Sequence, residues 1–324
     1  MTDRHLSLAC DLNTVTWPVA ADRVSTPGLD INFLALDDVN DMFRRMIRHQ
    51  EFEASELSMS SYLMAVDQGG PEFVAVPVFP SRVFRHGFLF VNDDAGIDEP
   101  ADLAGARVGV PSYSMTAALW ERAIVQHEYG VAPTEMTWVQ RRGQGTDEGD
   151  PLSLDLPDGL ELEAMPPGRT LSGMLADGDL DALFAPSVPD SYDGETVRRL
   201  FPDYRAVETD YYERTGYFPI MHVLVLRRDV YEGEEWIAGE LTRAFTEAKD
   251  RALDGLASAA RRKLAIPWAY EHLERVTETF GDDYWPYGVE ANREVLEAMC
   301  AYSHEQGLTS RQLSVDELFA PNTY

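Results

Sequence analysis

Positively charged residues are scarce in this chain. Lys and Arg together number 27 among 324 residues, against 56 Asp and Glu, which gives a formal charge of -29 at pH 7. Contacts to a phosphate backbone require clustered basic side chains. We therefore expect no nucleic acid among the partners of this protein.

Lysine is nearly absent, since Lys249 and Lys263 are its two occurrences. An acidic excess with so little lysine is typical of proteins that work in concentrated salt, where repulsion between surface charges is screened within a few ångströms. We interpret the acidic composition as a halophilic adaptation, in preference to an acidic face that binds a partner.

Cysteines and long apolar runs are also scarce. Cys10 and Cys300 are too few for a disulfide framework in a chain of this size, so we expect two unpaired, buried thiols. No stretch approaches the roughly 18 apolar residues of a membrane span. The first ten residues enter a strand-like alternation without a secretion signal. These absences predict a cytoplasmic protein with no membrane partner.

Several catalytic motifs are missing as well. The sequence has no zinc-type Cys and His spacing, no P-loop, no dinucleotide-binding glycine motif and no nucleophile elbow. We therefore predict no cofactor and no metal. A metal site assembled from distant Asp and His residues would escape such spacing rules and stays open.

The first third of the chain alternates between strand-like and helix-like segments. Period-2 and apolar runs predict strands, and a stripe of apolar residues at helical spacing predicts helices. The strands fall at residues 6–10, 29–34, 52–57 and 73–79, and the helices at 41–49 and from 58 to 65. This order implies a parallel sheet covered by helices.

The rest of the chain predicts a second unit and a return to the first. A capped turn near residue 98 leads to strands at 107–110, 136–140 and 183–185 and a helix at 114–129, with a solvated Gly- and Asp-rich loop at 140–159. A strand at 221–226 follows, and everything after Glu232 has helical spacing. We expect one domain from residues 1–91 and 213–324, a second from 92–212, and a ligand-binding cleft between them.

Two arginines and a histidine lie together where the chain is predicted to leave the first domain. Arg82, Arg85 and His86 follow an apolar strand and a pair of prolines. Guanidinium groups bind carboxylates in a bidentate manner, so two within four residues suit a dicarboxylate. The alternative is that these arginines pair with acidic residues of the chain itself.

Hydroxyl residues gather at two predicted strand-to-helix turns. The first turn contains Ser58, Ser60 and Ser61, and the second contains Ser112, Tyr113, Met115 and Thr116. Free backbone N–H groups at helix starts bind anions, and two such starts facing each other would hold an anionic ligand from both sides. The alternative for Ser58 or Ser60 is an ordinary N-cap.

Two of the seven histidines lie in apolar or strand contexts. These are His86 and His222, whereas the other five fall on predicted helix surfaces or near the first residue. Histidine titrates near neutrality and is the natural proton carrier. His222 fits a hydrogen-bonded core histidine equally well.

Six blocks of the sequence resemble the 4,5-dihydroxyphthalate decarboxylase family. They span nearly the whole chain and are 56–65, 79–86, 101–111, 218–222, 284–288 and 304–308. The resemblance implies a two-domain periplasmic-binding-protein type II fold with central mixed sheets flanked by helices. It also implies non-oxidative loss of CO2 from an aromatic dicarboxylate, as in the conversion of 4,5-dihydroxyphthalate to protocatechuate.

Within that reaction we expect Arg82 and Arg85 to anchor the carboxylates and His86 or His222 to deliver a proton. The hydroxyls of the two turns would fix the ring substituents. The alternative function is a non-catalytic solute-binding protein, related to ABC-transporter receptors, for a small carboxylate. The aromatic block around Trp285 fits a homo-oligomer interface as readily as a core.

Overall fold

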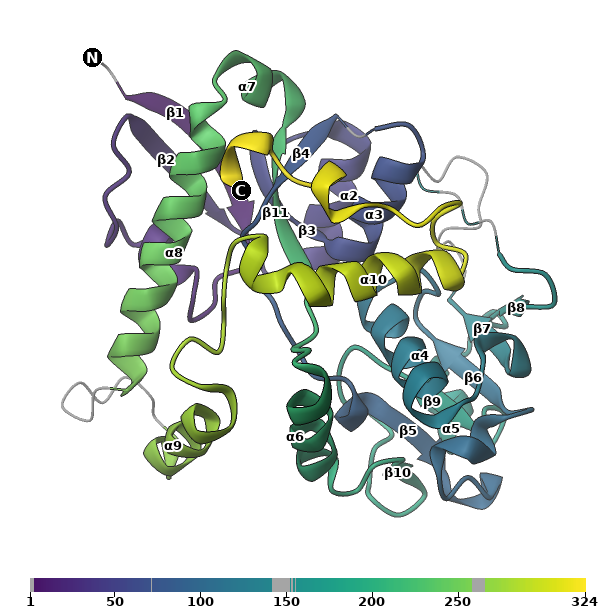
Figure 1. The fold of residues 1–324 in the computed structure, drawn as a ribbon. Coiled ribbons are helices and arrows are strands. Elements are labelled where there is room, and N and C mark those ends of the chain that lie inside the picture. Colours follow the sequence, from purple (N-terminus) through teal and green to yellow (C-terminus); the bar gives the residue numbers. More distant parts are fainter. Residues whose placement is uncertain (1–2, 71, 142–151, 153, 155, 258–265) are drawn as a thin grey trace.

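The computed structural model describes residues 3–70, 72–141, 152, 154, 156–257 and 266–324, and these form two mixed β-sheets flanked by helices (Figure 1). The predicted fold class is therefore confirmed. Part of the predicted loop at 140–159 lies outside the described residues.

The first sheet has five strands in the order β2-β1-β3-β11-β4. Its three leading strands run parallel, and β11 inserts antiparallel between β3 and β4. The strands are β1 (Arg4–Cys10), β2 (Leu29–Ala35), β3 (Ala54–Ser58), β4 (Phe73–Val76) and β11 (His222–Arg227). The expectation that the last part of the chain packs back on the first is confirmed by the position of β11.

The second sheet has six strands in the order β10-β5-β9-β6-β7-β8. It is parallel from β9 to β8 and antiparallel where β5 meets β9 and β10. The strands are β5 (Leu89–Asn92), β6 (Arg107–Val110), β7 (Thr137–Gln140), β8 (Glu161–Ala164), β9 (Ala182–Phe184) and β10 (Val197–Arg199).

The helices begin and end where the local sequence favours it. The side chain of Asp38 caps α2 by accepting from two backbone N–H groups, and Gly130 ends α4 at a φ of 78°. The helices are α1 (Trp17–Ala20), α2 (Val39–His49), α3 (Met59–Asp67), α4 (Thr116–Tyr129), α5 (Leu171–Ala176), α6 (Tyr204–Thr215), α7 (Arg228–Gly233), α8 (Trp236–Ala257), α9 (Ala269–Phe280) and α10 (Arg293–Glu305).

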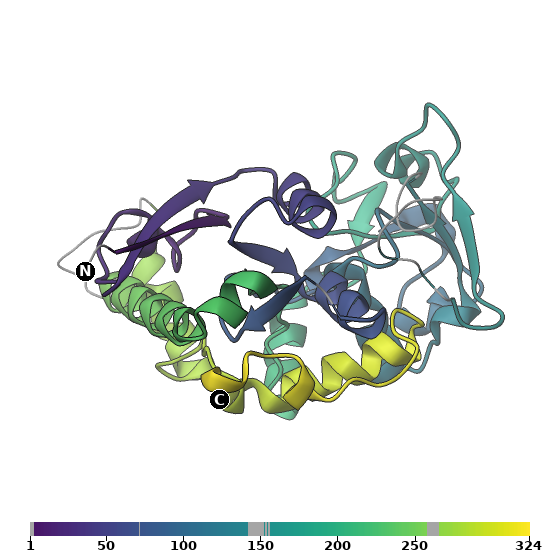
Figure 2. The same ribbon diagram turned by 90° about the horizontal axis from the view of Figure 1, so that it is seen from above.

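The prediction of helix throughout the chain after Glu232 is wrong in part. Helices α8, α9 and α10 account for most of this region, but residues 306–324 form turns and short 3-10 helices. Figure 2 shows this last segment passing along one side of the molecule. Leu318, Phe319 and Ala320 are buried in the core cluster although they are not helical. This segment therefore buries its apolar side chains without forming a helix.

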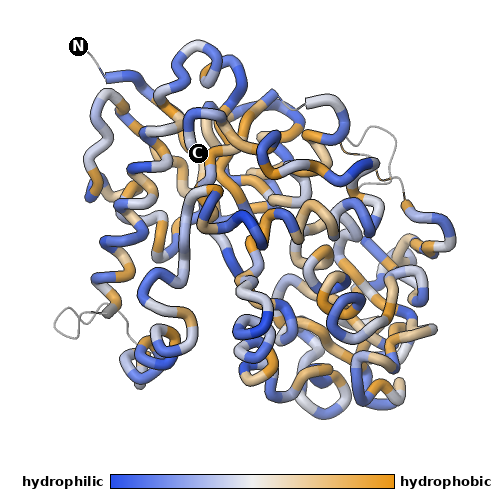
Figure 3. Tube along the Cα trace, in the orientation of Figure 1, coloured by the Kyte–Doolittle hydropathy of each residue, from blue (hydrophilic) through white to orange (hydrophobic). Residues whose placement is uncertain are grey.

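Buried apolar side chains from both sheets join in one large core cluster. Figure 3 shows hydrophobic segments, in orange, alternating with hydrophilic ones along the chain. Cys10 and Cys300 are buried and free, as expected. Trp285 packs on Phe218 and donates to the carbonyl of Phe79, so this aromatic block contacts the chain itself. None of the described helices combines the length and apolarity that a membrane crossing needs.

Two chain segments connect the sheets, and we call them the crossover segments. The first runs from residue 77 to 88, between β4 and β5, and the second from 200 to 221, between β10 and β11. The second contains α6. The predicted domain boundaries after residues 91 and 212 fall within β5 and α6, and the division into domains stays a prediction.

Candidate functional site

A cavity of about 970 Å³ lies between elements of the two sheets, and we call it the main cavity. Most of its lining comes from α2, the start of α3, the two crossover segments, the start of α4 and the loop after β9. This volume lies in the range of small-molecule sites. The predicted sites Ser58, Ser61, Arg85, Ser112, Met115, Thr116 and His222 all line it.

The starts of α3 and α4 meet at this cavity through a cluster of hydroxyl groups. The Thr116 Oγ1 atom lies 2.9 Å from Ser58 Oγ and accepts from the Ser60 backbone N–H at 3.1 Å. Ser60 itself is fully buried, and its hydroxyl donates to the carbonyl of Ser114 at 2.6 Å. The structure therefore brings the two predicted helix starts together, with Ser60 joining them rather than facing the cavity.

His222 lies beside this cluster because of the register of the first sheet. As the first residue of β11 it pairs with Ser58, the last residue of β3. Its Nδ1 atom lies 2.6 Å from Glu56 Oε1, and its ring contacts Phe43 edge-on at 4.9 Å between centroids. Because Nδ1 faces Glu56, Nε2 is the ring nitrogen left for a ligand in the main cavity.

Glu56 is a buried carboxylate held by several donors. Its Oε2 atom accepts from the Asp11 backbone N–H at 2.8 Å and from the Cys10 thiol at 3.2 Å. Burial acts to raise the pKa of Glu56, but the hydrogen bond and charge of His222 and the other donors outweigh it and lower this pKa. Glu56 is thus a buried anion whose hydrogen bond orients the ring of His222.

Arg85 is a buried cation with weak partners. Its Nε and Nη2 atoms lie 3.2 and 2.7 Å from the sulfur of Met221, and Nη1 donates to the carbonyl of Pro186 at 3.2 Å. A thioether is a weak acceptor, so the guanidinium keeps donor capacity for a ligand carboxylate. Burial lowers the pKa of Arg85.

Glu121 interacts electrostatically with Arg85, and its carboxyl group is fully buried with neither oxygen hydrogen-bonded. Burial raises the pKa of Glu121 well above its usual value, against the opposing charges of Arg85 and Arg122. This favours a neutral acid at Glu121. The positive charge of Arg85 is therefore left available to the main cavity.

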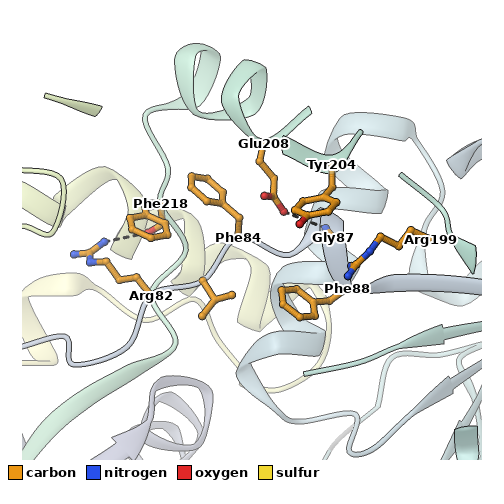
Figure 4. Close-up of a pocket in the computed structure, with 9 residues that line it drawn as sticks. Arg82, Phe84, Gly87, Phe88, Arg199, Tyr204, Glu208 and Phe218 are labelled. Carbon is orange, nitrogen blue, oxygen red and sulfur yellow. Dashed lines mark hydrogen bonds between the residues drawn. The ribbon is translucent and has the colours of Figure 1, made fainter. Parts of the chain in front are cut away.

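Besides Ser60, three predicted site residues lie away from the main cavity. The Arg82 guanidinium donates to the carbonyls of Phe218 and Pro286 and to the side chain of Asn292 (Figure 4). These hydrogen bonds are all made to the protein itself. His86 is buried between Phe201 and Tyr211, and burial lowers its pKa to about 4. Tyr113 is fully buried under the guanidinium of Arg122.

Sequence reasoning missed Glu56 and the cationic face of α2. Arg44 and Arg48 lie on that helix and line the main cavity, as does Arg141. The spacing of Arg44 and Arg48 places them on one face of a helix, which is a signal that could have been used. No signal in the sequence pairs Glu56 with a residue 166 positions away. The described residues contain no group of His, Cys, Asp and Glu suited to a metal ion.

The fold and cavity define a binding-protein-like α/β protein. The structure superposes on the periplasmic aliphatic sulphonate binding protein SsuA of Escherichia coli with a TM-score of 0.56 and 14% identity, over 100% of this chain and 99% of that chain. Residues 22–148 match the model of a family described as ABC transporter, phosphonate, periplasmic substrate-binding protein.

Sequence identity to two curated relatives identifies a more specific family than the fold does. A 4,5-dihydroxyphthalate decarboxylase of Comamonas testosteroni is 37% identical over 99% of this chain and 98% of its own length. One from Pseudomonas putida is 36% identical over 67% of this chain and 84% of its own length. The chain belongs to the 4,5-dihydroxyphthalate decarboxylase family.

Proposed function

We propose that this protein is a non-oxidative decarboxylase of a hydroxylated aromatic dicarboxylate, of the 4,5-dihydroxyphthalate type, and that the reaction takes place in the main cavity. The observation that carries the proposal is the Glu56–His222 pair, at 2.6 Å, beside the converging starts of α3 and α4. Family membership supports the reaction class.

Arg85 and the helix starts supply the binding of the anionic substrate. Arg85 offers a charge-assisted contact to one carboxylate, and the N-terminal ends of α3 and α4 favour negative charge near Ser58 and Thr116. The exposed cations Arg44 and Arg48 on α2 are placed to interact with a second carboxylate. The cavity thus combines cations on two sides with room for a substituted ring.

His222 is the proposed proton donor. In its protonated form it would transfer the Nε2 proton to the ring carbon that carries the departing carboxylate, while a ring hydroxyl supplies electron density. The C–C bond then breaks, its electron pair restores the aromatic ring, and CO2 leaves. His222 is left neutral with its Nδ1–H donated to Glu56, and solvent returns the proton to Nε2.

The test is CO2 release from 4,5-dihydroxyphthalate by the purified protein, with the aromatic product followed by absorbance. His222→Gln should abolish most turnover while substrate still shifts the melting temperature. His127→Gln is the matched control, since that histidine lies on the outer part of α4 in contact with Glu305. Equal turnover in both variants would contradict the assignment of His222.

Solute binding without catalysis is the second candidate function. The match of residues 22–148 to a substrate-binding family and the superposition on SsuA favour it. A thermal shift with 4,5-dihydroxyphthalate but no CO2 would identify a binder. No shift and no CO2 would point to another small acid.

We also propose that the protein works in the cytoplasm at high salt. The net charge of -29 and the near absence of lysine support the salt proposal. Turnover and melting temperature measured from low to molar KCl test it. A melting temperature that falls as salt rises would contradict this part.

A further inference from the structure

A second cavity of about 300 Å³ lies between the two crossover segments, and we call it the crossover cavity. It shares one lining residue, Val83, with the main cavity. The first crossover segment supplies Phe84, Gly87 and Phe88, and the second supplies Tyr204 and Glu208, with Arg199 just before it. Figure 4 shows Glu208 and Tyr204 from α6 facing the first crossover segment.

The walls of the crossover cavity are largely aromatic. Phe84, Phe88, Tyr204 and Phe218 contribute rings, and Phe84 stacks on Phe218 with centroids 4.6 Å apart. A Cβ atom at Gly87 would lie 2.8 Å from the Tyr204 ring, so this glycine permits the close approach of α6. Flat aromatic walls at this small volume suit a ligand with a single ring.

Arg199 supplies a positive charge at this cavity. Its guanidinium lies over the rings of Tyr204, Phe90 and Tyr192 at 4.8 to 5.2 Å. Within the part of the chain that the structure describes, no ion pair neutralises it. A guanidinium stacked on rings keeps its edge N–H groups for an anion.

Glu208 on α6 supplies a hydrogen-bonding group, and the charge of Arg199 acts on its carboxyl. One of its oxygens accepts from the Gly87 backbone N–H at 3.0 Å. The buried His86 Nδ1 atom lies 4.0 Å from the same oxygen and has no hydrogen-bond partner. Burial raises the pKa of Glu208 to about 7, so near neutrality its carboxyl can both donate and accept a proton.

We propose that the crossover cavity is a second binding site, for a monocyclic hydroxylated aromatic acid whose carboxylate contacts Arg199 and whose hydroxyl contacts Glu208. The ligand would contact both crossover segments, which connect the two sheets on either side of the main cavity. Occupancy of this site is therefore coupled to the relative position of the sheets. Binding of a ligand in the crossover cavity does not depend on catalysis in the main cavity.

The probe is 3-hydroxybenzoate, which has the carboxylate and hydroxyl of the expected ligand. Equilibrium dialysis against the wild-type protein should show a site that Arg199→Gln weakens at least tenfold and that Arg85→Gln leaves unchanged. Turnover of 4,5-dihydroxyphthalate without the probe should be the same in Arg199→Gln as in the wild type. Binding that Arg199→Gln leaves intact would overturn the proposal.

A second measurement covers the case in which Arg199→Gln fails to fold. Wild-type crystals soaked in 3-bromo-5-hydroxybenzoate should show anomalous bromine density between Phe84, Phe88 and Tyr204. Density confined to the main cavity would overturn the proposal. A wild-type protein that binds the probe here but releases no CO2 would refute the decarboxylase and leave this second site standing.

Discussion

Replacing Glu56 by Gln tests the role of the buried carboxylate most directly. The variant keeps the shape of the side chain and removes the charge 2.6 Å from His222 Nδ1. A hydrogen bond to a charged group contributes about 1.5 to 3 kcal/mol. Since about 1.4 kcal/mol corresponds to a tenfold change, we expect kcat to fall by roughly 10- to 150-fold.

The effect should be on kcat more than on KM. Without the carboxylate at Glu56 the His222 ring loses the charged partner that holds Nδ1 and orients Nε2, so proton transfer should slow. Substrate binding through Arg85 is left in place. The assay is CO2 release between pH 5 and 9, with the melting temperature measured in parallel to show that the variant is folded.

The matched control is Glu305→Gln, which changes the carboxylate of the exposed His127–Glu305 pair. This variant should keep wild-type kcat, because an exposed pair of this kind contributes little. A Glu56→Gln protein that is folded and retains wild-type kcat would refute the reasoning. His222 would then be a core histidine rather than a proton donor.

Three further perturbations test other parts of the molecule. Arg85→Gln should raise KM by about 10- to 100-fold, because a charge-assisted contact to a carboxylate is lost; initial rates check this, and an unchanged KM would place the carboxylate elsewhere. Thr116→Val should lower the free energy of unfolding by about 1 to 3 kcal/mol, because the Ser60 N–H loses its acceptor. Urea denaturation measures it, and Thr116→Ser should restore the value. Burial raises the pKa of Glu208 from 4.5 to about 7, so the folded state binds more protons between these values and stability should fall as pH rises through them. Glu208→Gln should flatten that slope in urea titrations, and an unaltered slope would mean another group titrates.

Local sequence determined the elements and the hydroxyl-rich turns. Strand alternation and helical spacing placed most strands and helices, because these patterns reflect which face each element buries. The serines and threonine at the two helix starts were identified because such residues satisfy free N–H groups. That the two starts meet, with Thr116 Oγ1 2.9 Å from Ser58 Oγ, follows from the packing of α3 on α4.

Tertiary structure alone decided which polar residues reach the main cavity. Arg82 and Arg85 are three positions apart, yet Arg82 is held by carbonyls of Phe218 and Pro286 while Arg85 lines the cavity. The irregular crossover segment has no period from which their directions could be read. Glu56 and His222 meet because β11 inserts antiparallel beside β3, a pairing across 166 residues. Sequence patterns report local burial, whereas a site built across strands depends on topology that no local pattern encodes.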